Sequence, residues 1–318
     1  MKNIYLNIYK PNLLNLKKAK KNIENNNIIA VPTETVYGLA GNAYSNISVK
    51  KIFRLKKRPP FNPLIIHYEN LKNLEKDIII NKNFIKLYKA FCPGPITFVL
   101  NKRQGSRISK IATASYKTVA VRFPKHKIIK KLLKILKFPL AAPSANIASK
   151  LSPTSAMDVF DEFGKKIKFI LDGGQCEIGL ESTIIDLTGK PIILRPGSIT
   201  AGKIEKILNK KIKIKKNPKK IKSPGQLKFH YSPGIPVKMN RNKIEKYQAF
   251  IGFGKKFKKG KNYFNLSKNG SLKEAANNLY KVMRKIKKNK YKSIAVKKIP
   301  NVGIGQAIND RLMKASKK

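Results

Sequence analysis

The sequence predicts a mixed α/β fold (α/β with α+β character) with a large domain built on a twisted mixed sheet and a smaller α/β domain after it. Strand-like apolar runs alternate with helix-like segments over residues 1–208, as expected for a sheet covered by helices. Residues 209–222 are lysine-rich with little to bury, and strand and helix patterns return after residue 233. We therefore predict a first domain over 1–208, a linker over 209–232 and a second domain over 233–318.

The elements of the first domain follow from apolar spacing and from prolines. Apolar residues recur at helical spacing over 46–58, and Pro59 and Pro60 follow them, so a helix is expected to end there. A second helix is expected over 153–163, with Ser152 or Ser155 as its cap. Further helices are expected at 83–91, 126–136 and from residue 200, and strands at 28–31, 63–67, 96–100, 118–123, 139–143, 168–171, 182–187 and 191–195.

The second domain repeats this pattern on a smaller scale. Strands are expected at 249–253 and 293–296, and a helix is expected after Gly303. The segment 271–287 places apolar side chains on one helical face. Between the two domains, SPGQLKFHYSPG (223–234) has two Ser-Pro-Gly turns around aromatic residues. A plain linker is polar and lacks such features, so this segment is expected to have a role of its own.

The net charge of +54 comes from 70 Lys and Arg against 16 Asp and Glu. Such a balance would suit a nucleic-acid binder, but 61 of the 70 are Lys, and they are scattered along the chain. We therefore favour composition bias over a nucleic-acid footprint. Each of the nine Arg is therefore a candidate for a specific role, because only guanidinium offers a planar fork with two parallel donors.

Several classes of protein are excluded or disfavoured. A hydrophobic content of 42% excludes a disordered chain. Cys92 and Cys176 cannot form a disulfide framework, and no signal peptide or membrane span is visible, so the sequence predicts a cytoplasmic protein without a membrane partner. Nucleotide-binding glycine motifs and the GxSxG elbow are absent. His67, His126 and His230 are not spaced as metal ligands, so no metal site is predicted.

Four polar clusters lie at the ends of apolar segments, where α/β folds build ligand sites. Each alone is compatible with a turn, a cap or a solvated helix end. The clusters are Thr33-Glu34-Thr35 with Tyr37 and Gly38; Lys56 and Arg58 with Asn62 and His67; Ser144 and Asn146 with Ser152; and Glu181-Ser182-Thr183 with Asp172-Gly173-Gly174 before it and Arg195-Pro196-Gly197 after it.

Taken together, these segments resemble one family in content and order. PTETVYGL, the KxR of LKKRPPFNPLIIH, CPGPITFVL, TVAVRFP, AAPSAN, SPT, DGG, GLESTIIDL and ILRPGSIT cover residues from about 28 to 200. They resemble the motif series of the YrdC-like L-threonylcarbamoyladenylate synthases. SPGQLKFHYSP resembles the linker of the long two-domain form, and GIGQAINDRLMKAS resembles its second domain.

The resemblance implies a YrdC-like catalytic domain that converts L-threonine, bicarbonate and ATP to threonylcarbamoyl-AMP and pyrophosphate, with Mg²⁺ carried by ATP. It also implies a separate tRNA threonylcarbamoyl transferase as the partner that uses the product to modify the adenosine beside the anticodon. Phosphoryl chemistry of this kind needs positioning and charge stabilisation more than a covalent nucleophile.

Site residues are carried over from the family by motif position. Lys56 and Arg58 are expected to neutralise the triphosphate, and Tyr231 would make the linker a lid over the nucleotide. The expected threonine contacts are Thr35, His67, Arg122, the backbone at Ala142 and Ser182. The expected ATP contacts are Arg58, Asn62, Thr118, Ser144, Asn146, Ser152, Arg195 and Tyr231.

Two other functions stay open at this point. A double-stranded RNA-binding module of the same fold would be served by a concave basic surface, and non-specific RNA binding is compatible with the charge. A hydrolase or a carbamoyltransferase accessory domain could keep the fold and use another acyl group. A pure binding module, however, has no need for an amino-acid pocket or for a tyrosine in the linker.

Overall fold

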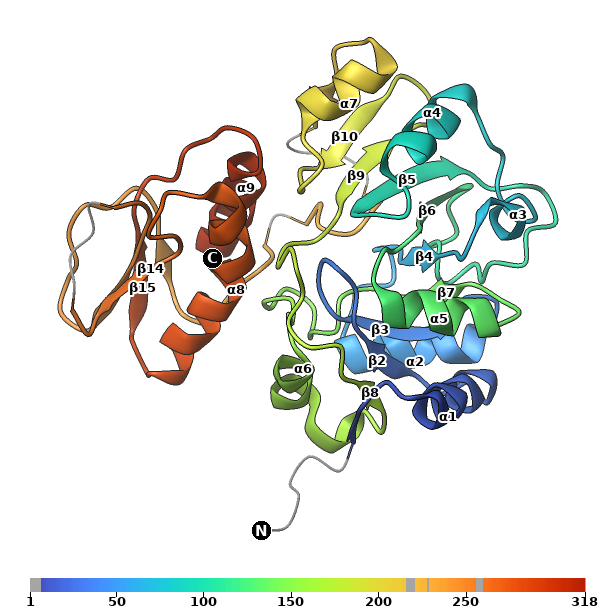
Figure 1. Cartoon of the computed structure of the whole chain (residues 1–318), viewed down its shortest axis with the longest axis horizontal. Coiled ribbons are helices and arrows are strands. Elements are labelled where there is room, and N and C mark those ends of the chain that lie inside the picture. The colour runs from blue at the N-terminus through green and yellow to red at the C-terminus, as the bar shows by residue number, and fades with distance from the viewer. Residues whose placement is uncertain (1–6, 216–220, 228, 256–259, 318) are drawn as a thin grey trace.

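The computed structural model describes residues 7–215, 221–227, 229–255 and 260–317. These residues form two sheets, one in each predicted domain, with the linker between them (Figure 1). The large sheet runs in the order β1-β8-β2-β3-β7-β4-β6-β5-β9-β10-β11, and neighbouring strands are both parallel and antiparallel. The mixed-sheet prediction is therefore confirmed. The strands are β1 (Ile8–Tyr9), β2 (Ile29–Val31), β3 (Gly38–Asn42), β4 (Ile65–His67), β5 (Ile96–Asn101), β6 (Thr118–Arg122), β7 (Leu140–Ala141), β8 (Ile170–Leu171), β9 (Thr183–Asp186), β10 (Ile192–Arg195) and β11 (Lys213–Ile214).

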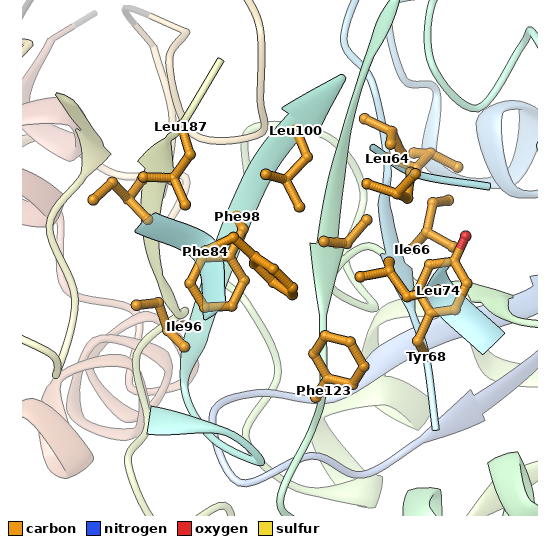
Figure 2. Close-up of a cluster of buried hydrophobic side chains, with 14 of the residues drawn as sticks. Leu64, Ile66, Tyr68, Leu74, Phe84, Ile96, Phe98, Leu100, Phe123 and Leu187 are labelled. Atoms are coloured by element: carbon orange, nitrogen blue, oxygen red, sulfur yellow. The ribbon is translucent and has the colours of Figure 1, made fainter. Parts of the chain in front are cut away.

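Helices cover this sheet through their apolar faces. One large cluster joins the sheet to α2, α3, α4 and α7, and two others join it to α1 with α5 and to α6. Figure 2 shows aromatic rings at the centre of the first cluster, where the Phe84 and Phe98 rings meet edge to face with centroids 5.0 Å apart. The helices are α1 (Leu13–Glu24), α2 (Asn46–Lys56), α3 (Leu71–Leu74), α4 (Lys82–Phe91), α5 (Lys127–Ile135), α6 (Ala156–Phe163) and α7 (Ala201–Leu208).

The opposite face of the central strands carries much less apolar packing. Ile66 and Val121 point into the large cluster, whereas their strand neighbours Ile65 and Ala120 belong to a small cluster on the other side, because side chains alternate between faces. The linker runs beside this side, where Lys222 forms an ion pair with Asp186 at the end of β9, at 3.1 Å. A lightly packed sheet face under a linker leaves room for a site.

The second domain has a four-stranded sheet in the order β12-β15-β13-β14, and every pair in it is parallel. Its helices α8 and α9 bury one apolar face each, and the predicted stripe of 271–287 is confirmed because Ala276, Leu279, Met283 and Ile286 are all buried. The elements are β12 (Val237–Lys238), β13 (Gln248–Gly252), β14 (Tyr263–Asn265), α8 (Leu272–Lys288), β15 (Ser293–Val296) and α9 (Gly305–Ser316).

Some element predictions were wrong in detail. The helix predicted over 153–163 begins at Ala156, because Ser155 takes the cap position and accepts a hydrogen bond from the amide of Asp158. The helix predicted over 46–58 ends at Lys56, where Lys57 adopts a left-handed backbone conformation. Helices α1 and α3 and strands β1, β3, β12 and β14 were not predicted. Strand β11 extends the large sheet into the segment predicted as linker, and the domain boundaries themselves stay a prediction.

Within the described residues, no helix has both the length and the apolar character needed to cross a membrane.

Candidate active site

A cavity of about 30 Å³ lies against the lightly packed face of the large sheet, under the linker. Space of this size holds about two water molecules. Its walls come from the β2–β3 loop, the ends of β4, β6 and β10, the loop after β7, and the linker. Seven of the predicted site residues line it, although they are spread along the chain: Arg58, His67, Arg122, Ala142, Ser144, Arg195 and Tyr231.

Two of the predicted threonine residues, His67 and Arg122, lie at the carboxyl ends of the adjacent parallel strands β4 and β6, and a third, Ser182, directly precedes β9. The register pairs His67 of β4 with Arg122 of β6, and Arg122 with Thr97 of β5. The Thr97 hydroxyl is hydrogen-bonded to the Ser182 hydroxyl at 2.7 Å. These side chains thus form one polar row across the end of the sheet, and Thr97 is a member that sequence reasoning missed.

Two members of this row hold polar atoms that no described residue satisfies. Neither ring nitrogen of His67 has a hydrogen-bond partner among the described residues, and the same is true of Arg122 Nε. Burial, together with the nearby charge of Arg122, lowers the pKa of His67 well below its usual value, so the ring is neutral. Buried polar groups without partners are costly, and here they lie at a cavity, so they suit a polar ligand.

Glu34 fixes the direction of Arg122. Its Oε1 lies 2.7 Å from the Arg122 guanidinium, and its Oε2 accepts a hydrogen bond from the backbone amide of Lys125. Burial alone would raise the pKa of Glu34, but the charge and hydrogen bond of Arg122 outweigh it and hold that pKa below its usual value. Glu34 therefore carries a negative charge and uses one side of the Arg122 fork.

Two further threonine-site predictions concern the loops beside the row. The Thr35 side chain does not line the cavity, but its hydroxyl is hydrogen-bonded at 2.8 Å to that of Thr33, which does. Ala142 lines the cavity, and its amide donates to the carbonyl of Ile65 at 3.0 Å.

Arg58 and Arg195 form the second, strongly cationic part of the cavity. The Arg58 guanidinium donates to the carbonyl and the side-chain oxygen of Asn62 and to the carbonyl of Pro63, at 2.7–2.8 Å. Burial, with the positive charge of Arg195 nearby, lowers the pKa of Arg58 to about 9. Two buried guanidinium groups that disfavour each other's charge create a site for an anion. Asn62 thus contacts Arg58. Thr118 starts β6, where it pairs with Asn101 of β5, and does not line the cavity.

Lys56 lies behind the cavity. Its ammonium donates to the backbone carbonyls of Ser144 and Asn146, and burial, with Arg58 nearby, lowers its pKa well below the usual value. The KxR and SxN segments are therefore joined by Lys56, which positions the Ser144 loop. The predicted contact of Lys56 with phosphates and the ligand role of Asn146, which does not line the cavity, stay predictions.

The two predicted serines Ser152 and Ser182 do not line the cavity but lie beside Glu181. The sequence analysis did not select this carboxylate as a ligand contact. The Ser152 hydroxyl donates to Glu181, which lines the cavity. Arg195 donates to the Ser182 carbonyl and hydroxyl at 3.1 and 3.2 Å. Burial alone would raise the pKa of Glu181, but Arg311 and Arg195 lower it to about 2. Arg311 comes from the second domain and was also missed.

The linker closes the cavity with Pro224, His230 and Tyr231. Tyr231 is 1% exposed and has φ +61°, a left-handed conformation that is uncommon and strained for a bulky residue. The chain beside it is fixed to the first domain, since the amide of Ser232 donates to the carbonyl of Ser149 at 2.8 Å. The linker thus lies where a lid would.

Comparisons with known proteins identify the family of the chain. A model of the Sua5–YciO–YrdC family, described as telomere recombination, matches residues 21–197, and the model of the threonylcarbamoyl-AMP synthase C-terminal domain matches residues 199–317. The chain is 39% identical to the threonylcarbamoyl-AMP synthase of Pyrococcus abyssi over 319 residues, 92% of each chain. It is 34% identical to that of Bacillus subtilis over 327 residues, 95% of this chain and 92% of the other.

Solved structures give the same result. The structure of P. abyssi Sua5 complexed with L-threonine superposes with a TM-score of 0.89 at 35% identity and covers 98% of this chain and 97% of that one. Escherichia coli YciO, at 21% identity and a TM-score of 0.53, shares the fold over 59% of the chain. Both predicted domains are thus matched by one family along nearly the whole chain, and the protein belongs to the two-domain threonylcarbamoyl-AMP synthase family.

Proposed function

We propose that this enzyme makes L-threonylcarbamoyladenylate from L-threonine, bicarbonate and ATP and releases pyrophosphate. The observation that carries the proposal is the division of one cavity into two parts. One part offers Arg122 and neutral His67 with unsatisfied nitrogens, which suits an amino acid. The other offers Arg58 and Arg195, which suit a polyphosphate. The resemblance to a threonine-bound relative along nearly the whole chain supports the same assignment.

In the proposed reaction, the threonine carboxylate binds the free side of the Arg122 fork, opposite Glu34. The unprotonated amine attacks the carbon of bicarbonate, and water leaves as the carbamate forms. A carbamate oxygen then attacks the α-phosphorus of ATP, and the bond to the β-phosphate oxygen breaks. Arg58 and Arg195 stabilise the charge that develops on the departing pyrophosphate.

The proposed Mg²⁺ arrives with the triphosphate. Among the described residues, no group of three or more His, Cys, Asp and Glu side chains could hold a metal ion. Glu181, the carboxylate that lines the cavity, is paired with Arg311, and Glu34 is paired with Arg122. These side chains offer no ready ligand set, and Mg²⁺ carried by ATP would take its ligands from phosphate oxygens and water, as it commonly does.

The product is a mixed carbamic–phosphoric anhydride, which is a reactive acyl donor. We propose that a separate transferase in the cytoplasm uses it to modify the tRNA adenosine beside the anticodon. A lid over the cavity supports this proposal, because exclusion of water protects both the carbamate and the anhydride from hydrolysis.

The test is pyrophosphate release from ATP by the full-length protein, with L-threonine and bicarbonate each omitted in turn. We expect release only when all three substrates are present, and a threonylcarbamoyl-adenylate mass among the products. Release that is independent of threonine would contradict the proposal and favour another acyl group. Absence of release together with tight double-stranded RNA binding would favour the binding-module alternative.

A further inference from the structure

Two side chains from the second domain reach the carboxylate of Glu181 at the cavity wall. Tyr280 of α8 donates its hydroxyl to Glu181 at 3.1 Å, and Arg311 of α9 donates its Nε at 2.9 Å. Both side chains are essentially buried, with Tyr280 at 0% and Arg311 at 1% exposed. Arg311 also donates to the carbonyl of Pro196, next to the predicted ATP contact Arg195, at 2.9 Å. The second domain therefore contacts the catalytic site itself.

The same two side chains contact the linker. The Arg311 guanidinium lies over the Tyr231 ring, 5.0 Å from its centroid, which is the geometry of a cation–π interaction. The Tyr280 ring is stacked near Tyr231 with centroids 6.0 Å apart. One turn further along α9, Lys314 donates to the carbonyl of Gly225 at 2.8 Å. Helix α9 therefore holds the covering segment at both of its ends.

These contacts differ in strength in a way that suits a closing device. Arg311 is anchored to Glu181 and Asp310 by buried ion pairs, and breaking such a pair is costly. Its contact with Tyr231 and the Lys314 hydrogen bond are individually weak. The linker can therefore leave while Arg311 stays in place. It has to leave at some stage, because Pro224, His230 and Tyr231 of the linker cover the cavity that the substrates must enter.

We propose that Arg311 is a positioning residue of the synthase. It holds the linker residues 223–227 and 229–232 closed over bound nucleotide and fixes Glu181 at the cavity wall, with Lys314 as the second point of contact. This proposal rests on the proposed function for the identity of the nucleotide. It assigns to the second domain the task of stabilising the closed lid, beyond its attachment to the first domain.

The first test measures the lid without any substrate. Hydrogen exchange at the amides of Ser223, Tyr231 and Ser232, which are hydrogen-bonded in the closed linker, is compared in the full-length protein and in Arg311→Lys. Lysine keeps the charge beside Glu181 but has no planar fork to cover the ring. We expect exchange at these amides to rise about tenfold. Because this readout needs no catalysis, it stands even if the proposed function fails.

The second test separates positioning from general stability. Arg311→Lys should raise the KM for ATP about tenfold and leave the KM for threonine within about twofold, since the predicted threonine contacts lie upstream of the linker. Lys314→Met, which removes the contact with Gly225 and the ion pair with Asp310 and leaves the Arg311–Glu181 pair in place, should shift both lid exchange and the KM for ATP in the same direction. It is the variant to use where Arg311→Lys lowers the yield of folded protein.

Lys288→Ala is the matched control. Lys288 also joins the two domains, through an exposed ion pair with Asp161 at 2.6 Å, at the carboxyl end of α8 and about two turns from Tyr280. It should change neither lid exchange nor the KM for ATP. The proposal is overturned if Arg311→Lys and Lys314→Met leave lid exchange unchanged, or if Lys288→Ala alters it as much as they do.

Discussion

Four of the nine arginines lie at the cavity or directly beside it. Arg58, Arg122 and Arg195 line the cavity, and Arg311 lies just outside it against Glu181 and Tyr231. The chain uses Lys for 61 of its 70 cationic residues. At this cavity it uses arginine, whose planar guanidinium can donate in several directions at once. Arg58 illustrates this with bonds to both the side chain and the backbone of Asn62.

Replacing Arg58 by alanine is the sharpest test at this scale. Arg58→Ala should reduce pyrophosphate release about a thousandfold, because a positioned charge on a phosphoryl transition state is worth several kcal/mol. Arg54→Ala is the control, since Arg54 is exposed on the preceding turn of α2 and does not line the cavity. Steady-state pyrophosphate assays of both variants decide the matter, and equal activity would remove Arg58 from the site.

At the scale of elements, the linker differs from a simple tether. Its first Ser-Pro-Gly turn places Gly225 at φ +82°, so close that a Cβ atom there would meet Arg195 Cδ at 2.6 Å and the Tyr231 hydroxyl at 2.8 Å. Only glycine allows this approach of backbone to side chain. The second Ser-Pro-Gly turn has Gly234 at φ +85°, where the nearest atom is the flexible end of Lys287.

These two glycines form a matched pair. Gly225→Ala and Gly234→Ala pay a similar backbone penalty of about 1–2 kcal/mol, but Gly225→Ala alone disturbs Arg195 and Tyr231. We expect Gly225→Ala to raise the KM for ATP at least about tenfold and Gly234→Ala to leave it near the wild-type value. Similar KM values in the two variants, with similar losses in thermal stability, would mean that the first turn only joins the domains.

An element was predicted well from the sequence where its own residues carry a clear apolar pattern. Long amphipathic helices such as α8 and alternating strands such as β6 carry their own pattern and were predicted nearly to the residue. β3 was missed because GLAGN, with two glycines, has no strand-like alternation and is specified by pairing with β2. α1 was missed because its apolar stripe, Leu16, Ala19 and Ile23, is sparse among lysines and asparagines.

The residues of the candidate site also differ in how far the sequence predicted their roles. Motif order was enough to select Arg122 and His67, which the sheet brings into register. Glu34 and Glu181 were visible as members of polar clusters, but their roles depend on partners 88 and 130 residues away, Arg122 and Arg311. Pairing at that separation is fixed by the tertiary fold, and a single sequence has no local signal for it.

At the scale of the whole molecule, the net charge of +54 attracts anionic partners over longer distances than the contacts inside the cavity do. Scattered surface lysines bind nucleic acid by releasing counterions, so the affinity falls steeply with salt. Ligands held by buried arginines in the cavity are screened much less. A change in ionic strength therefore separates nucleic-acid binding by surface lysines from ligand binding in the cavity.

Raising the salt concentration from about 50 to about 200 mM should weaken binding of duplex RNA at least about a hundredfold. The same change should alter the KM for ATP only a few-fold. Filter binding and pyrophosphate assays in the same buffers provide the comparison. RNA affinity that is insensitive to salt and selective for sequence would instead indicate a specific RNA site on the protein.

The position of Arg311 along the chain has a consequence for biosynthesis. A ribosome builds the protein from its amino end, so Arg311 is made after each residue that it contacts from α8, the linker and the first domain. A nascent chain that stops short of α9 already has Arg58, His67, Arg122 and Tyr231, and it has neither of the α9 side chains that hold the linker down. Helix α9 thus completes the lid of a pocket whose other walls have already been translated.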